Sequence, residues 1–143
     1  AQKLVEALCS RWGGPENPFV VCTGGEPLLQ LDADLVAALH RRDVEIALET
    51  NGTLLPPPGV DWITVSPKAG APFFLTSGDE LKLVYPQAGA EPEQFEHLSF
   101  RFFFLQPMDG PERQVNTERA LDYCLRHPRW RLSLQTHKIL GIR

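Results

Sequence analysis

The sequence has 143 residues, which is enough for one domain and excludes two full-sized ones. Lys and Arg number 14 and Asp and Glu number 18, so the formal net charge is −4, which argues against broad binding to nucleic acid. With 43% hydrophobic and 22% charged residues, the composition is typical of a globular protein with a buried core and excludes disordered and fibrous proteins.

The chain has neither a membrane segment nor a secretion signal in its sequence. No apolar run approaches the roughly 18 to 20 residues that span a bilayer, and residues 1–14 lack a basic start followed by an apolar block. We therefore expect a cytoplasmic protein with no membrane partner and no direct nucleic-acid partner. Because the chain starts at Ala1 within a helical pattern, we expect its natural beginning to lie upstream.

The first half of the chain predicts helices alternating with strands. Apolar residues at helical spacing predict a helix over 1–12, and the apolar run Phe19–Cys22 predicts a buried strand that ends in a glycine turn. Residues 31–42 predict a second helix, which Asp32 can cap. A strand follows at Glu45–Glu49.

The second half of the chain adds four strands and at least one helix. A run of three prolines at 56–58 first predicts a stiff surface loop. The further strands are predicted over residues 62–66, 80–85, 100–106 and 130–135, and a capped helix is predicted over 116–128.

Strands that alternate with helices predict a parallel α/β sheet, and such sheets bind ligands beyond the carboxyl ends of their strands. The unusual polar and glycine residues gather at those ends, in the segments CTGGEP, ETNGT, VSPK, LQPMDG and LQTHK. The sequence therefore predicts a ligand site at this edge of the sheet.

The segment TGGEP at 23–27 is the most informative of these segments. Two glycines at a strand end let a ligand approach the backbone, and Glu26 supplies a carboxylate for a cation. A Gly-Gly pair alone is more often an ordinary turn. TGGEP followed by ETNG, however, resembles the radical S-adenosylmethionine superfamily. The segments VSPK, ELKLV, QPMDG and LSLQTHKILGIR are similar, in order and spacing, to the 7-carboxy-7-deazaguanine synthase family.

This resemblance implies both a fold and a reaction. The fold would be an abbreviated partial (β/α) barrel of the radical S-adenosylmethionine type, truncated at its N-terminus, with residues 1–143 as a single domain. The reaction would be that of a carbon–nitrogen lyase in queuosine biosynthesis, which converts 6-carboxy-5,6,7,8-tetrahydropterin to 7-carboxy-7-deazaguanine with loss of ammonia. It would use S-adenosylmethionine, a [4Fe–4S] cluster and Mg²⁺. A homodimer and an electron donor such as flavodoxin are also implied.

The resemblance assigns two groups of site residues. Contacts with S-adenosylmethionine are implied for Gly24, Gly25, Glu26, Asn51, Ser66, Lys68, Gln106, Pro107, Met108 and Asp109. Contacts with the pterin are implied for Thr23, Gly25, Gln135, His137 and the terminal carboxylate of Arg143. Glu26 would bind the methionyl ammonium, Lys68 the cofactor carboxylate and Asp109 the ribose hydroxyls. Glu49 is a weaker candidate for the cofactor side.

The cysteines depart from the family pattern. Cys9, Cys22 and Cys124 do not form the CxxxCxxC motif that holds the cluster. We predict that Cys22 and Cys124 are buried small hydrophobes, with Cys124 on an apolar helix face with Leu121 and Leu125, and that Cys9 likewise shares a helix face with apolar residues. We expect the cluster and Mg²⁺ ligands upstream, and we assign no metal ligand or catalytic residue here. The chain alone is then expected to be inactive.

Two alternatives remain open. A glycyl-radical activase shares the GGEP strand, although LQTHK and SPK argue against it. A degenerate paralogue could bind a purine, a pterin or a protein without catalysis. His40 and His127 are interpreted as helix-end residues that interact with the helix dipole, and His97 has no assigned function.

Overall fold

A single open sheet of parallel strands organises the molecule. The computed structural model describes residues 1–14 and 17–142. Its six strands lie in chain order, and every neighbouring pair is parallel. The strands are β1 (Phe19–Cys22), β2 (Glu45–Thr50), β3 (Trp62–Val65), β4 (Ser77–Tyr85), β5 (Ser99–Pro107) and β6 (Trp130–Leu132). Because β1 and β6 are the two edges, the sheet is a partial barrel, as predicted.

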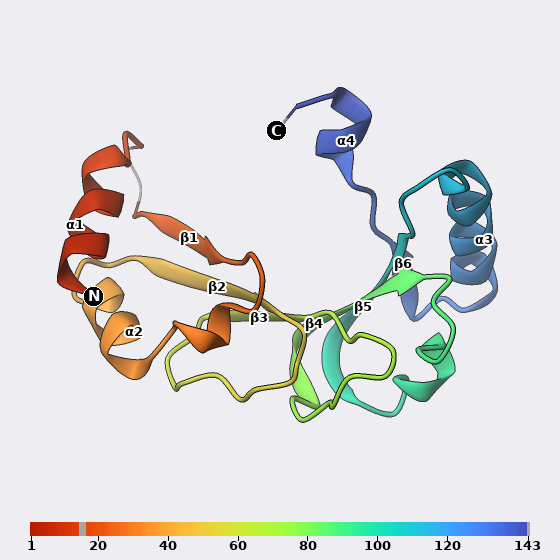
Figure 1. The fold of residues 1–143 in the computed structure, drawn as a ribbon, viewed down its shortest axis with the longest axis horizontal. Coiled ribbons are helices and arrows are strands. Elements are labelled where there is room, and N and C mark those ends of the chain that lie inside the picture. The colour runs from red at the N-terminus through yellow and green to blue at the C-terminus, as the bar shows by residue number, and fades with distance from the viewer. Residues whose placement is uncertain (15–16, 143) are drawn as a thin grey trace.

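The longer helices lie beside the two edges of the sheet. They are α1 (Gln2–Arg11), α2 (Ala33–His40), α3 (Arg113–Arg126) and α4 (Thr136–Leu140), with short 3₁₀ helices η1 (Pro27–Leu29) and η2 (Pro92–Gln94). Figure 1 shows α1 and α2 beside β1 and β2, α3 beside β5 and β6, and the sheet curving so that both edges rise on one side. Within the described ranges, no helix is long and apolar enough to cross a membrane.

All six strands were predictable, but several boundaries move. β4 begins three residues before the predicted start, and β6 ends at Leu132, so residues 133–135 are outside the strand and the short helix α4 follows them. α3 begins at Arg113, so Asn116 does not cap it. The Asn116 side chain is instead buried within the helix, and its Nδ2 donates to the carbonyl oxygen of Met108 at 3.1 Å.

The prediction that β1 is buried is wrong for half of its residues. Phe19 and Val21 are 47% and 44% exposed, whereas Val20 and Cys22 pack against a core. The reason is that side chains alternate along the strand, and only Val20 and Cys22 point into the core cluster formed with α1, α2 and β2.

Two apolar clusters form the core. The first joins β3, β4 and β5 to α3 and β6, with Leu81, Leu83 and Leu105 fully buried. The second joins α1 and α2 to β2 and includes Ile46 and Leu48. The sheet is thus anchored separately at its two ends.

The cysteines are divided between these clusters. Cys9 and Cys22 pack against the second cluster and Cys124 against the first, so the predicted apolar packing is confirmed. The predicted burial is not, because all three side chains are only partly buried. Burial raises the pKa of the Cys22 and Cys124 thiols. Leu121 and Leu125, however, are exposed, which corrects the predicted apolar face of α3.

Two of the histidines lie at helix ends, as expected. His40 is in the last turn of α2, where its Nε2 lies 3.1 Å from Asp61 Oδ2. His127 follows α3 and stacks on the Tyr123 ring, with 4.0 Å between ring centroids. Both have local protein contacts that account for their positions.

Candidate active site

An open cavity of about 460 Å³ lies at the carboxyl ends of the strands, where the sequence predicted a ligand site. Side chains alternate between the two faces of β4: Leu81 and Leu83 point into the core, and Lys82 and Val84 line the cavity. The cavity therefore lies on the face of the sheet opposite to this core. The lining residues are Thr23, Gly24, Gly25, Glu49, Thr50, Asn51, Thr64, Ser66, Lys68, Lys82, Val84, Gln106, Ser133, Leu134, Gln135 and His137.

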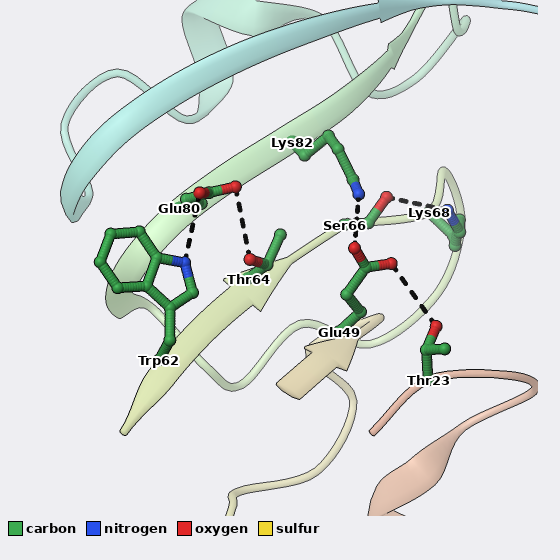
Figure 2. Close-up of polar contacts among 8 residues, drawn as sticks. All are labelled: Thr23, Glu49, Trp62, Thr64, Ser66, Lys68, Glu80 and Lys82. Carbon is green, nitrogen blue, oxygen red and sulfur yellow. Dashed lines mark hydrogen bonds and ion pairs between the residues drawn. The ribbon is translucent and has the colours of Figure 1, made fainter. Parts of the chain in front are cut away.

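An ion pair crosses the middle of this cavity. Lys82 Nζ lies 3.1 Å from Glu49 Oε1, and the Thr23 hydroxyl donates to Glu49 Oε2 over a long 3.5 Å. Lys82 comes from β4 and Glu49 from β2, so the pair reaches across β3, as Figure 2 shows. Two other segments of the chain thereby hold the Glu49 carboxylate.

A second cation stands beside this pair. Lys68 Nζ donates to Ser66 Oγ at 3.0 Å, just after β3. Desolvation, and secondarily the positive charge of Lys82, lower the pKa of Lys68. Two ammonium groups and one carboxylate give this part of the cavity a net positive charge, which suits an anionic group such as a carboxylate.

A layer of larger side chains lies on the same face, toward the start of the strands. Glu80 accepts from Trp62 Nε1 at 3.2 Å and from Thr64 Oγ1 at 3.4 Å. The Trp62 ring stacks on Phe102, with 6.1 Å between centroids, and Arg101 lies 5.1 Å from the centre of the Phe102 ring. Figure 2 shows the contacts of Glu80 with Trp62 and Thr64, and of this layer only Thr64 lines the cavity.

Glu26 has an internal role that the sequence did not predict. Its carboxylate accepts from Leu28 N at 3.1 Å, from Thr50 Oγ1 at 2.8 Å and from Asn51 N at 2.9 Å. It therefore joins the turn after β1 to the end of β2, and it does not line the cavity. Gly24 does line it, with φ of +117° and open space where a Cβ would lie.

Most of the predicted site residues come together. Nine of them line the cavity: Thr23, Gly24, Gly25, Asn51, Ser66, Lys68, Gln106, Gln135 and His137. Pro107 faces a second cavity of about 440 Å³ beside α3 and α4, and Met108 lines neither. Arg143 lies outside the described residues.

Asp109 is engaged elsewhere in the structure. Its Oδ2 lies 2.6 Å from Lys138 Nζ of α4, and the hydrogen bond from Lys138 lowers the pKa of the Asp109 carboxyl. The predicted bonds to ribose hydroxyls would therefore compete with this ion pair. The Asp109–Lys138 pair instead ties the segment after β5 to α4.

Sequence reasoning missed Lys82 and Thr64. The signal lay in ELKLV, where charged and apolar residues alternate in a strand that is central to a parallel sheet. Strands covered on both faces are apolar throughout, so charged residues at alternate positions indicate a face that lines a cavity.

The described residues fit only part of the implied cofactor set. Ser66, Lys68 and the glycine backbone offer the donors and acceptors that a zwitterionic nucleoside needs. No group of three His, Cys, Asp or Glu residues able to hold a metal occurs among residues 1–14 and 17–142. This part of the chain therefore does not supply the ligands of an iron–sulfur cluster.

The open parallel sheet, with its polar cavity at the strand ends, defines an α/β protein of the partial-barrel type with a candidate site of small-molecule size. The chain is 61% identical over 143 residues to the 7-carboxy-7-deazaguanine synthase of Caulobacter vibrioides. This match covers 99% of the chain and 68% of that protein. The enzyme of the same name from Bordetella pertussis is 59% identical, with the same coverage. No protein-family model matches the chain.

A solved structure agrees with these relatives. The crystal structure of QueE from Escherichia coli matches with a TM-score of 0.72 and 27% sequence identity, over 94% of this chain and 63% of that one. The chain belongs to the 7-carboxy-7-deazaguanine synthase family. It spans about two thirds of the length of these relatives.

Proposed function

We propose that this protein acts in the synthesis of 7-carboxy-7-deazaguanine from 6-carboxy-5,6,7,8-tetrahydropterin, with loss of ammonia. It would thus be a carbon–nitrogen lyase of queuosine biosynthesis. The observation that carries the proposal is the convergence of the family motifs of several strand ends on one cavity. The names of the relatives support the same reaction.

We assign the cavity residues to two ligands. Lys68 would pair with the carboxylate of S-adenosylmethionine, Ser66 would bond its ribose, and the backbone of Gly24 and Gly25 would meet its methionyl group. The other proposed contacts of this cofactor are Asn51, Gln106, Pro107, Met108 and Asp109. The proposed pterin contacts are Thr23, Gly25, Gln135, His137 and the carboxylate of Arg143.

Glu26 keeps a proposed contact with the methionyl ammonium. A carboxylate offers about four acceptor positions, and three donors already use the Glu26 oxygens. One further donor can therefore be accepted. We propose that its larger contribution is to fix the turn that carries Gly24 and Gly25.

Other parts of the proposal concern the whole protein. S-adenosylmethionine, with a [4Fe–4S] cluster and Mg²⁺, supplies the radical chemistry when bound. We propose that residues 1–143 form a single domain of the radical S-adenosylmethionine core. We also propose that the protein is a cytoplasmic homodimer that receives electrons from a donor such as flavodoxin.

Lys68→Met tests the cofactor assignment. In the intact protein, affinity for S-adenosylhomocysteine, measured by calorimetry, should fall by about tenfold or more because a charge-assisted bond is lost. Lys3→Met removes an exposed lysine of α1 and should leave that affinity unchanged. Equal affinity of the Lys68→Met variant and the unsubstituted protein would contradict the assignment.

A further inference from the structure

Lys82 is a partly buried cation in the centre of the sheet. Its side chain is 20% exposed, and the ion pair with Glu49 compensates its charge. An ammonium group removed from water needs such a partner. The position of Lys82 therefore depends on Glu49, and that of Glu49 on Lys82.

Glu49 is fixed from two sides and still faces the cavity. Lys82 donates to Oε1 and Thr23 donates to Oε2, while the Glu49 side chain keeps 44% of its surface exposed. Each carboxylate oxygen has a further acceptor position. Figure 2 shows both contacts of the carboxylate. The Glu49 side chain is thus oriented by the protein and still lines the cavity.

The proposed pterin substrate carries ring N–H and amino groups, which are donors that a carboxylate can accept. We propose that Lys82 is a positioning residue, which orients the Glu49 carboxylate to accept N–H groups of the pterin. This inference rests on the proposed function. Lys82 acts through Glu49 and makes no contact of its own with the pterin.

Lys82→Met and Lys82→Arg test this role in the intact protein. Calorimetry would measure the affinity for 6-carboxypterin, a stable pterin carboxylate, and for S-adenosylhomocysteine. Lys82→Met should weaken pterin binding by about tenfold and change S-adenosylhomocysteine binding by less than about threefold. Lys82→Arg keeps a cation within reach and should restore most of the pterin affinity.

The double variant separates positioning from direct contact. If Lys82 acts through Glu49, Lys82→Met combined with Glu49→Gln binds the pterin no more weakly than Glu49→Gln alone. Additive losses would instead mean that Lys82 contacts the ligand itself, and would overturn the inference. A parallel loss of both ligands and of thermal stability, without rescue by arginine, would also overturn it.

Binding of 6-carboxypterin to the unsubstituted protein separates a failure of this inference from a failure of the proposed function. If it binds no 6-carboxypterin, the proposed function fails and the inference with it. If it binds the pterin and Lys82→Met binds it equally well, the inference alone fails.

Discussion

Gly52, just after β2, is the residue where backbone and packing constraints coincide. Its φ is +80°, and an added Cβ would lie 2.8 Å from both Phe73 Cε2 and Val65 Cγ1. Gly52→Ala should therefore lower the free energy of unfolding by about 2 to 5 kcal/mol, from backbone strain and overpacking together. Urea denaturation of the chain would measure it.

Gly70→Ala is the matched control for this prediction. Gly70 has a similar φ of +73°, but nothing lies within 4 Å of its added Cβ. Gly70→Ala should therefore lower the free energy of unfolding through backbone strain alone, by about 1 to 2 kcal/mol. Equal losses at the two positions would show that the contacts of Gly52 do not matter.

Glu26 yields a second prediction at this scale. Glu26→Ala leaves three donors without their carboxylate, so we expect a loss of about 1 to 3 kcal/mol in unfolding free energy. Judged from the sequence alone, Glu26 sits at an edge, and its loss would weaken only cofactor binding. Glu118→Ala, on the exposed surface of α3, should change stability by less than about 0.5 kcal/mol. Equal stability of the two variants in urea would refute the structural role.

The positions of residues in the site were predictable where a motif carries them, whereas contacts between distant parts of the chain were not. Ser66 and Lys68 lie in one short segment and do line the cavity. Lys82 and Glu49 lie 33 residues apart, and Glu26 and Thr50 lie 24 apart. No local pattern indicates either contact, because both depend on how the strands are placed side by side.

At the scale of the element, Tyr123 attaches α3 to the loop that contains η2. Its hydroxyl donates to Glu93 Oε1 at 2.9 Å, and its ring packs on Tyr85. Tyr123→Phe removes this bond, so at pH 8 the variant should be less stable by about 1 to 2 kcal/mol. Chemical denaturation with circular dichroism would measure the difference.

The stability difference between the unsubstituted protein and Tyr123→Phe should also depend on pH. Desolvation, and then the hydrogen bond to Glu93, raise the pKa of Tyr123 above its ordinary value of 10.0. Above pH 10 the unfolded chain loses this proton while the folded chain keeps it, so stability falls as pH rises. The stability difference between the unsubstituted protein and Tyr123→Phe should therefore narrow between pH 8 and pH 11. A constant difference would mean that the Tyr123 proton is equally bound in both states.

Helices were predictable where their apolar pattern extends over at least two turns. α2 and its Asp32 cap match the prediction, since Asp32 Oδ1 accepts from Leu35 N at 2.8 Å. The short helix α4 has only 5 residues, too few for a helical period to be recognised in the sequence. The start of α3 was misplaced because Asn116, a typical capping residue, serves a tertiary contact.

At the scale of the whole molecule, the order of the strands determines the site. Because all six strands are parallel, every carboxyl end lies on the same edge, and the segments after β1, β2, β3 and β6 can face one cavity together with Gln106 at the end of β5. The sequence predicted this edge from glycine and polar residues alone. The curvature of the sheet, with helices beside both of its edge strands (Figure 1), is not indicated by those residues.

The two separate cores also determine what the thiols can bind. Cys9 and Cys22 pack at the α1 and α2 end of the sheet, whereas Cys124 packs against the cluster near α3. Three thiolates that hold one cluster must converge within a few ångströms. Anaerobic incubation of the 143-residue chain with iron and sulfide should therefore yield no stoichiometric cluster by absorption or electron paramagnetic resonance. A cluster that forms, and that Cys22→Ala abolishes, would require β1 to leave its place in the sheet, and would contradict the packing of the second core.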